Sequence, residues 1–151
     1  KIYDVEMYYI EDYETGKSPY EGHYLHSNVK VKKVSQKVQF FKGDYWIDMG
    51  QPQNRYIVET LEPQAPDSYF AWNFFDGILQ RKEYFSPYVF EDSAMEILEK
   101  NPTLKAALDA KKVADEKFAK SAYAQLMFIY ERSELAEKTY KRYPVGRFFY
   151  K

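Results

Sequence analysis

The amino-acid sequence predicts an α+β fold in which a small antiparallel β meander comes first, and a helical half follows and packs against it. Two observations support this prediction. Apolar and polar residues alternate in the first third of the chain, as in a sheet with one solvated face. From residue 91 onward, apolar residues recur at helical spacing behind capping residues. We expect a single domain over residues 1–151, with residues 1–50 mainly β, 51–90 an aromatic-rich mixed segment and 91–143 mainly helical.

The predicted meander contains three strands. Every second residue from Tyr3 to Tyr9 is apolar, while Asp4 and Glu6 point the other way, which predicts the first strand. Residues 21–34 form the second predicted strand, with His26 on its polar face, and residues 38–41 form the third. A tight connection through Gly43 then leads into residues 45–49, which complete the meander.

Two segments in the middle of the chain are ambiguous between helix and strand. Residues 55–61 contain β-branched side chains, but Pro52 before them and Pro63 after them favour a helix. Residues 72–79 are apolar at every spacing, so their periodicity does not distinguish helix from strand. We expect this second segment to be buried on all sides.

The remaining elements are predicted to be helices. Asp92 or Ser93 can cap a helix, and Ser93-x-x-Glu96 has the capping-box spacing, so a helix should start there and end before Asn101. Asn101 caps the next predicted helix, and Asp115 caps a further one that continues to residue 129. A last short helix is expected over residues 133–140. Residues 142–147 are expected to dock back on the body or on an adjacent domain.

Composition excludes several classes of function. Lys and Arg total 22 and Asp and Glu total 23, so the concentrated positive field of a nucleic-acid-binding protein is missing. No apolar run approaches 18 residues, so we expect no membrane span. Cysteine is absent, which excludes disulfides and thiolate metal sites. Aromatic residues make up 19% of the chain and include 16 tyrosines, which suits core filling, a half-exposed binding platform or a homo-oligomer.

Candidate binding residues lie among these aromatic side chains. Trp46 or Trp72 could stack on a sugar or a peptide, with Asn73 and Asp76 as polar neighbours; core packing is the alternative. Three arginines could hold a carboxylate in a bidentate way: Arg55, Arg142 and Arg147. The binding candidates are therefore Trp46, Arg55, Trp72, Asn73 and Asp76.

Candidates for catalysis are weaker. The two histidines, His23 and His26, are three apart and would point to opposite faces of a strand, so they are poor joint metal ligands, and we expect no metal site in this chain. Glu62, Asp67 and Asp76 could supply the carboxylate pair of a small hydrolase. The alternative is a structural role for each, at a helix end, a helix cap and a turn.

Several short motifs together resemble one family. They are Gly43-Asp44-Tyr45, Gln51-Pro52, Leu61-Glu62-Pro63, Asp67-Ser68 and Trp72-Asn73-Phe74-Phe75-Asp76, flanked by Tyr20-Glu21-Gly22-His23-Tyr24, by residues 85–92 and by residues 138–145. This pattern resembles the region downstream of the catalytic domain in bacterial M14-type zinc carboxypeptidase-like proteins, in the version found in the Bacteroides group. The family's zinc motif does not map onto His23–His26, where a histidine stands in place of the required glutamate.

The resemblance implies a non-catalytic C-terminal accessory domain. Its partner would be the upstream catalytic domain of the same polypeptide, which it would pack on and support. Zinc is expected only in that upstream domain, and no cofactor in this chain. The resemblance also implies a secreted or periplasmic location, and the start at Lys1 without a methionine suggests a fragment of a longer protein.

Overall fold

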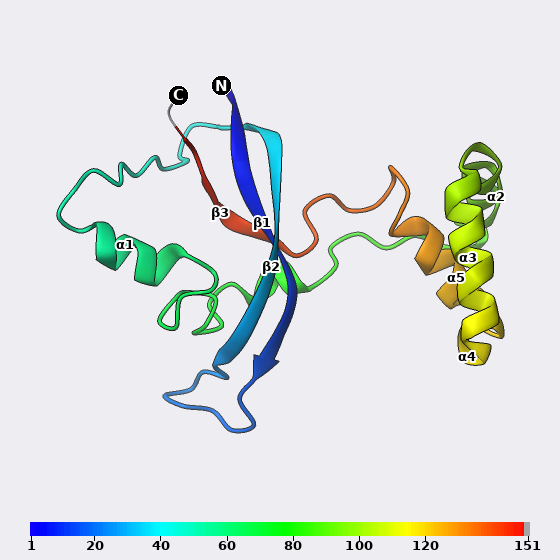
Figure 1. Ribbon diagram of the computed structural model, residues 1–151, viewed down its shortest axis with the longest axis horizontal. Helices are drawn as coiled ribbons and strands as arrows, with labels where there is room; N and C mark the ends of the chain where they lie inside the picture. Colours follow the sequence, from blue (N-terminus) through cyan, green and yellow to red (C-terminus); the bar gives the residue numbers. More distant parts are fainter. Residues whose placement is uncertain (150–151) are drawn as a thin grey trace. The chain divides into compact units, whose positions relative to one another are not determined.

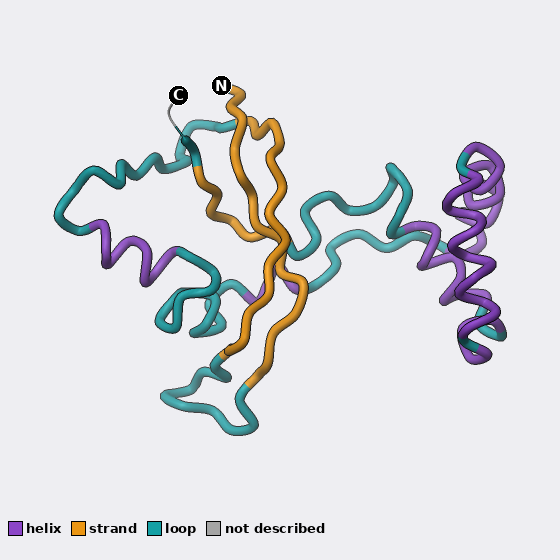
Figure 2. Tube along the Cα trace, viewed as in Figure 1, coloured by secondary structure: helices purple, strands orange, loops and turns teal. Residues whose placement is uncertain are grey.

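A computed structural model describes residues 1–149, which form two compact units. Unit 1 comprises residues 1–80 and the C-terminal segment from Thr139, and it contains a three-stranded antiparallel sheet. Unit 2 comprises residues 81–138 and is helical, as the colouring in Figure 2 shows. The α+β prediction is confirmed. The expectation that the whole chain is a single domain stays a prediction.

The sheet of unit 1 has the strand order β2-β1-β3. β1 (Ile2–Thr15) and β2 (His26–Gln39) form a long hairpin, and β3 (Arg142–Arg147) pairs with the other side of β1 (Figure 1). The predicted meander is therefore wrong in its third strand. Residues 38–39 end β2 and residues 45–49 are not a strand; the third strand of the sheet comes from the far end of the chain and pairs with β1.

The two strands of the hairpin have complementary charge. β1 contains acidic but no basic residues, and β2 contains lysines but no acidic residues. The pairing places Asp4 opposite Lys37 and Asp12 opposite Lys30, and Lys30 Nζ lies 3.0 Å from Asp12 Oδ2. Cross-strand pairs of opposite charge stabilise a sheet by roughly 0.2–1 kcal/mol each. A one-residue slip would separate these pairs.

β3 lies very close to β1 because residue 146 is a glycine. A Cβ atom there would approach Met7 Sδ and would lie 2.7 Å from Val5 Cγ1 and 3.0 Å from the Glu6 carbonyl oxygen. Pro144 lacks an N–H donor, which an edge strand tolerates. The prediction that residues 142–147 dock on the body of the protein is confirmed.

The core of unit 1 lies between the sheet and the turn-rich segment 62–80. Its fully buried residues are Tyr8, Ile10, Phe70 and Tyr143. Partly buried side chains complete it: Tyr13, Val29, Val31, Phe75, Ile78, Leu79 and Val145. The rings meet edge to face, with 5.5 Å between the centroids of Phe75 and Tyr143. This core fixes the turn-rich segment, and with it the polar residues discussed below.

α1 (Asn54–Leu61) confirms the helix predicted over residues 55–61. It begins at Asn54, so Pro52 precedes the helix and does not occupy its first position. Residues 72–79 form turns followed by a short 3₁₀ helix, η1 (Asp76–Leu79). The prediction that this segment is buried on all sides is wrong, because Phe74 is exposed and no residue of η1 is buried. Only one side of the segment contacts the core.

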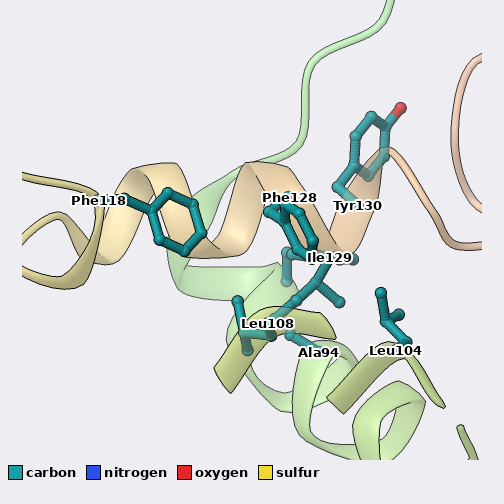
Figure 3. Close-up of a cluster of buried hydrophobic side chains, with 8 residues drawn as sticks. Ala94, Leu104, Leu108, Phe118, Phe128, Ile129 and Tyr130 are labelled. Carbon is teal, nitrogen blue, oxygen red and sulfur yellow. The ribbon is translucent and has the colours of Figure 1, made fainter. Parts of the chain in front are cut away.

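Unit 2 contains four helices in succession: α2 (Pro87–Lys100), α3 (Pro102–Ala114), α4 (Glu116–Ala119) and α5 (Ala122–Tyr130). Their packed side chains form a second core, shown in Figure 3: Phe90, Ala94, Leu104, Leu108, Phe118, Phe128, Ile129 and Tyr130. Within the described residues 1–149, no helix has both the length and the apolar character needed to cross a bilayer.

Two predicted helix caps are confirmed, two helix boundaries are corrected and one predicted helix does not form. The side chains of Asn101 and Asp115 each accept a bond of 3.0 Å from the backbone N–H three residues later. α2 begins at Pro87, before the predicted start at Ser93. The helix predicted from Asp115 to residue 129 is interrupted at Ser121, whose hydroxyl caps α5. Residues 133–140 form turns and not a helix.

Candidate functional site

Unit 1 contains a pocket of about 490 Å³, which we call the aromatic groove. Three segments supply its walls: residues 45–49, one side of α1 with Ile57, Val58 and Leu61, and residues 145–149 at and after the end of β3. Glu62 and Arg147 supply charged groups among these apolar side chains. Ligand-binding pockets typically have volumes of roughly 300–1,000 Å³ and combine apolar walls with a few polar groups, so the groove is the leading candidate site.

Helix α1 presents its apolar side to the groove and not to a core. Ile57 and Leu61 are four residues apart and therefore share one side of the helix, yet none of the eight residues of α1 is buried. Helices this short are marginal by themselves and depend on tertiary packing. The groove thus has one wall whose apolar side chains lack the burial that usually stabilises such a helix.

Aromatic rings form the opposite end of the groove. The Trp46 and Phe148 ring centroids are 4.6 Å apart, and Tyr3 contacts Phe148 at 5.6 Å and Phe40 at 5.8 Å. Trp46 remains 46% exposed, although it belongs to this cluster. The structure therefore places the predicted binding residue Trp46 in the candidate site, and its alternative assignment to a buried core is wrong.

A hydrogen-bonded group of three residues borders the groove. Tyr8 Oη donates to Glu62 Oε2 at 2.9 Å, and Arg147 Nε donates to Glu62 Oε1 at 2.8 Å. The Arg147 guanidinium also lies 5.6 Å from the centre of the Tyr8 ring. Burial raises the pKa of Tyr8 well above its ordinary value, and the bond to the Glu62 carboxylate raises it further. The bond to Glu62 also raises the pKa of Arg147.

This arrangement favours binding over proton transfer. A phenol whose pKa is raised holds its proton more firmly and is a poorer acid at neutral pH. Both oxygens of Glu62 already accept hydrogen bonds from the protein itself. Sequence reasoning considered Glu62 and Arg147 separately and missed their pairing, since the two residues lie 85 positions apart and no local pattern connects them.

The two histidines belong to a second cluster, away from the groove-lining residues. His26 Nε2 lies 2.7 Å from Asp76 Oδ1, and its Nδ1 lies 3.3 Å from Thr15 Oγ1. His23 Nδ1 lies 2.7 Å from Asn73 Oδ1. His26 is buried, so its predicted place on the polar face of the hairpin is wrong. The two rings engage different partners and tie the end of the hairpin to residues 73–76.

Trp72 lies half-buried beside this cluster. Its ring contacts Tyr20 and His23 at centroid distances of 6.0 and 5.8 Å, and its Nε1 lies 3.5 Å from Asp67 Oδ1. Asn73 has a φ of 53°, in the left-handed region where asparagine is enriched. Each of the predicted residues Trp72, Asn73 and Asp76 thus contacts a histidine: His23 for the first two and His26 for Asp76.

The other predicted residues are dispersed. Arg55 is exposed on α1, and no ion-pair partner for it exists among residues 1–149. The three carboxylates proposed for a hydrolase engage three different sets of partners: Tyr8 and Arg147 for Glu62, Trp72 for Asp67 and His26 for Asp76. Within the part of the chain that the structure describes, no three His, Asp or Glu side chains are arranged to hold a metal ion.

Comparison with known proteins gives no match for this chain. No protein-family model, curated protein or solved structure matches the chain significantly. Function is therefore inferred from the geometry of the aromatic groove and its surroundings.

Proposed function

We propose that this chain is a non-catalytic accessory module whose aromatic groove receives an extended, apolar segment of a neighbouring polypeptide domain. The observation that supports this best is the groove itself, with its apolar helix wall and its half-exposed Trp46. Filling the groove would bury the apolar side of α1, and burial is worth about 25 cal/mol per Å² of apolar surface.

The position of β3 favours an extended peptide as the occupant. β3 is an edge strand, so part of its backbone hydrogen-bonding capacity faces away from β1. Its residues Val145, Gly146 and Arg147 also line the groove. A peptide there could bond to the strand edge while its alternate side chains fill the pocket, which is the usual mode of strand addition.

The charged pair bordering the groove favours positioning of a ligand. The Glu62–Arg147 pair is held by Tyr8, so it offers fixed polar groups at one place in a mainly apolar pocket. Such fixed groups orient a bound chain without requiring a reaction.

The proposed source of the segment is a catalytic domain that precedes this chain in the same polypeptide. This follows from the resemblance to the post-catalytic region of M14-type carboxypeptidase-like proteins. On this proposal the zinc ion belongs to that preceding domain, and the protein is secreted or periplasmic.

A glycan-binding platform is the second candidate function, favoured by the exposure of Trp46. The two candidates make different predictions for the same titration. Trp fluorescence should change on addition of an alternating Val-Thr peptide if the groove takes polypeptide, and on addition of a cello- or chito-oligosaccharide if it takes a glycan.

A matched pair of substitutions tests the location. Val58→Asp places a charge on the groove side of α1, whereas Val113→Asp makes the same change at an exposed position in unit 2. We expect Val58→Asp to weaken peptide binding roughly tenfold, the cost of about 1.4 kcal/mol, and Val113→Asp to leave it unchanged. Equal effects of the two changes would contradict the proposal. It would also be contradicted if Trp72→Phe, which lies outside the groove, were the one change that abolished peptide binding.

A further inference from the structure

We infer that the open edge of β2 is a second binding site, which takes an extended acidic strand of another polypeptide. This site is separate from the aromatic groove, because β2 and β3 lie at opposite edges of the sheet. The inference depends on which part of the edge is open, on its charge, and on the strand that β2 already accepts.

Only the start of β2 is covered on its outer side. The backbone N–H of His26 donates to the Ala71 carbonyl at 2.7 Å, and Gln64 Nε2 donates to the Val29 carbonyl at 2.9 Å. For residues 30–39, β1 is the one backbone partner within the described chain. At about 3.3 Å per residue, this open edge is roughly 30 Å long. It therefore offers a row of backbone donors and acceptors to an added strand.

The open part of β2 is positively charged. It carries four lysines and no acidic residue: Lys30, Lys32, Lys33 and Lys37. Lys30 is paired with Asp12, and Lys33 Nζ lies 4.0 Å from Glu6. Lys32 and Lys37 have no ion-pair partner among residues 1–149. These two residues lie an odd number of positions apart, so they project from opposite faces of the sheet.

β1 already pairs with β2, so its charge indicates which kind of strand the outer edge of β2 would bind. β1 is acidic, and the register sets carboxylates opposite lysines at Asp4–Lys37 and Asp12–Lys30. A second strand on the outer edge would meet the same lysines from the other side. Carboxylates on both of its faces could then reach Lys32 and Lys37.

The same charges argue against a second copy of this chain as the occupant. Pairing two β2 edges would bring lysines together, which is how edge strands avoid self-association. The lysines of β2 repel a second β2 strand and attract an acidic strand, so the edge discriminates between the two.

Three peptides test this inference. One repeats Glu-Glu-Thr-Thr, so that carboxylates lie on both faces of the extended strand, the second replaces each Glu by Lys, and the third is an uncharged alternating Val-Thr peptide. Binding is followed by NMR through the amide hydrogen exchange of residues 30–39. We expect the acidic peptide to bind and to slow the exchange of the outward-facing amides, and the affinity to fall as salt is added. The basic peptide should not bind.

Substitutions at the two unpaired lysines test the charge. Lys32→Gln with Lys37→Gln should weaken the acidic peptide about fivefold, whereas Lys105→Gln with Lys112→Gln on α3 should have no effect. Any of three results would overturn the inference: unchanged binding of the acidic peptide to the β2 variant, equal binding of the acidic and basic peptides, or amide exchange in residues 30–39 that the acidic peptide does not slow. Val58→Asp should leave acidic-peptide binding intact, so failure here and failure of the groove proposal are distinguishable.

Discussion

The same chemical change at two buried tyrosines should alter stability in opposite directions. Tyr143 is 0% exposed, and its hydroxyl has no hydrogen-bond partner among the described residues. Tyr8 is 2% exposed, but its hydroxyl donates to Glu62 at 2.9 Å. Phenylalanine keeps each ring and removes only the oxygen. Tyr143→Phe should therefore stabilise the fold and Tyr8→Phe should destabilise it.

The magnitudes follow from the environment of each hydroxyl. Burying a hydroxyl without a hydrogen bond costs roughly 1–3 kcal/mol in protein mutational data, and the lost packing of one oxygen offsets a few tenths of this. We expect Tyr143→Phe to raise the free energy of unfolding by about 1 kcal/mol, since its edge-to-face contacts with Phe70 and Phe75 are kept. Tyr8→Phe loses a bond to a carboxylate and should lower that free energy by about 1–2 kcal/mol.

Urea unfolding followed by tryptophan fluorescence is the appropriate assay. Both tryptophans, Trp46 and Trp72, lie in unit 1, as do the two tyrosines, so the signal reports on that unit. A change of 1 kcal/mol corresponds to a shift of roughly 4–8 °C in the melting temperature of a unit this size. A loss of stability in Tyr143→Phe, with the same sign as in Tyr8→Phe, would refute the reasoning. It would show that the Tyr143 hydroxyl has a partner.

Three further predictions concern the same units. Burial raises the pKa of Tyr8 and Tyr143, so unfolding releases their protons above about pH 10. Above that pH, the free energy of unfolding should fall by about 1.4 kcal/mol per pH unit for each tyrosine, as measured by urea unfolding between pH 9 and 12. A free energy of unfolding that does not change with pH would contradict this. Gly146→Ala should lower the melting temperature of unit 1, because the added Cβ would clash with Val5 and the backbone of β1. An unchanged melting temperature would mean that β3 is not held against β1. Asp115→Ala removes the cap of α4 and should cost unit 2 about 1 kcal/mol by circular dichroism, with no effect on tryptophan fluorescence.

Local chemistry made part of this fold predictable from the sequence. Asn101 and Asp115 cap helices because their side chains reach a backbone N–H only three residues away. The alternation in β1 and the helix at α1 were likewise visible in short windows. Other helix boundaries were not predicted, since α2 begins after Ser86 without a side-chain cap bond, and the local cap at Ser121 lies within an apolar stripe that continues from Asp115.

The candidate site was predictable only in its parts. Trp46 was identified because its ring could stack on a sugar or a peptide. Its role as a groove wall depends on Phe148, which lies at the other end of the chain. His26 was placed on the polar face by alternation alone, but its ring is buried because Asp76 and Thr15 supply partners for both nitrogens.

The sequence by itself determined the elements whose causes lie within a few residues: the caps, the alternating strand, the charge pattern of the hairpin and the absence of cysteine chemistry. Only the tertiary structure decided that β3 completes the sheet, that Glu62 meets Arg147 and that a groove forms beside α1. The physical reason is that these contacts join residues far apart in the chain. Their pairing depends on shape and burial in three dimensions, which no local pattern of side chains encodes.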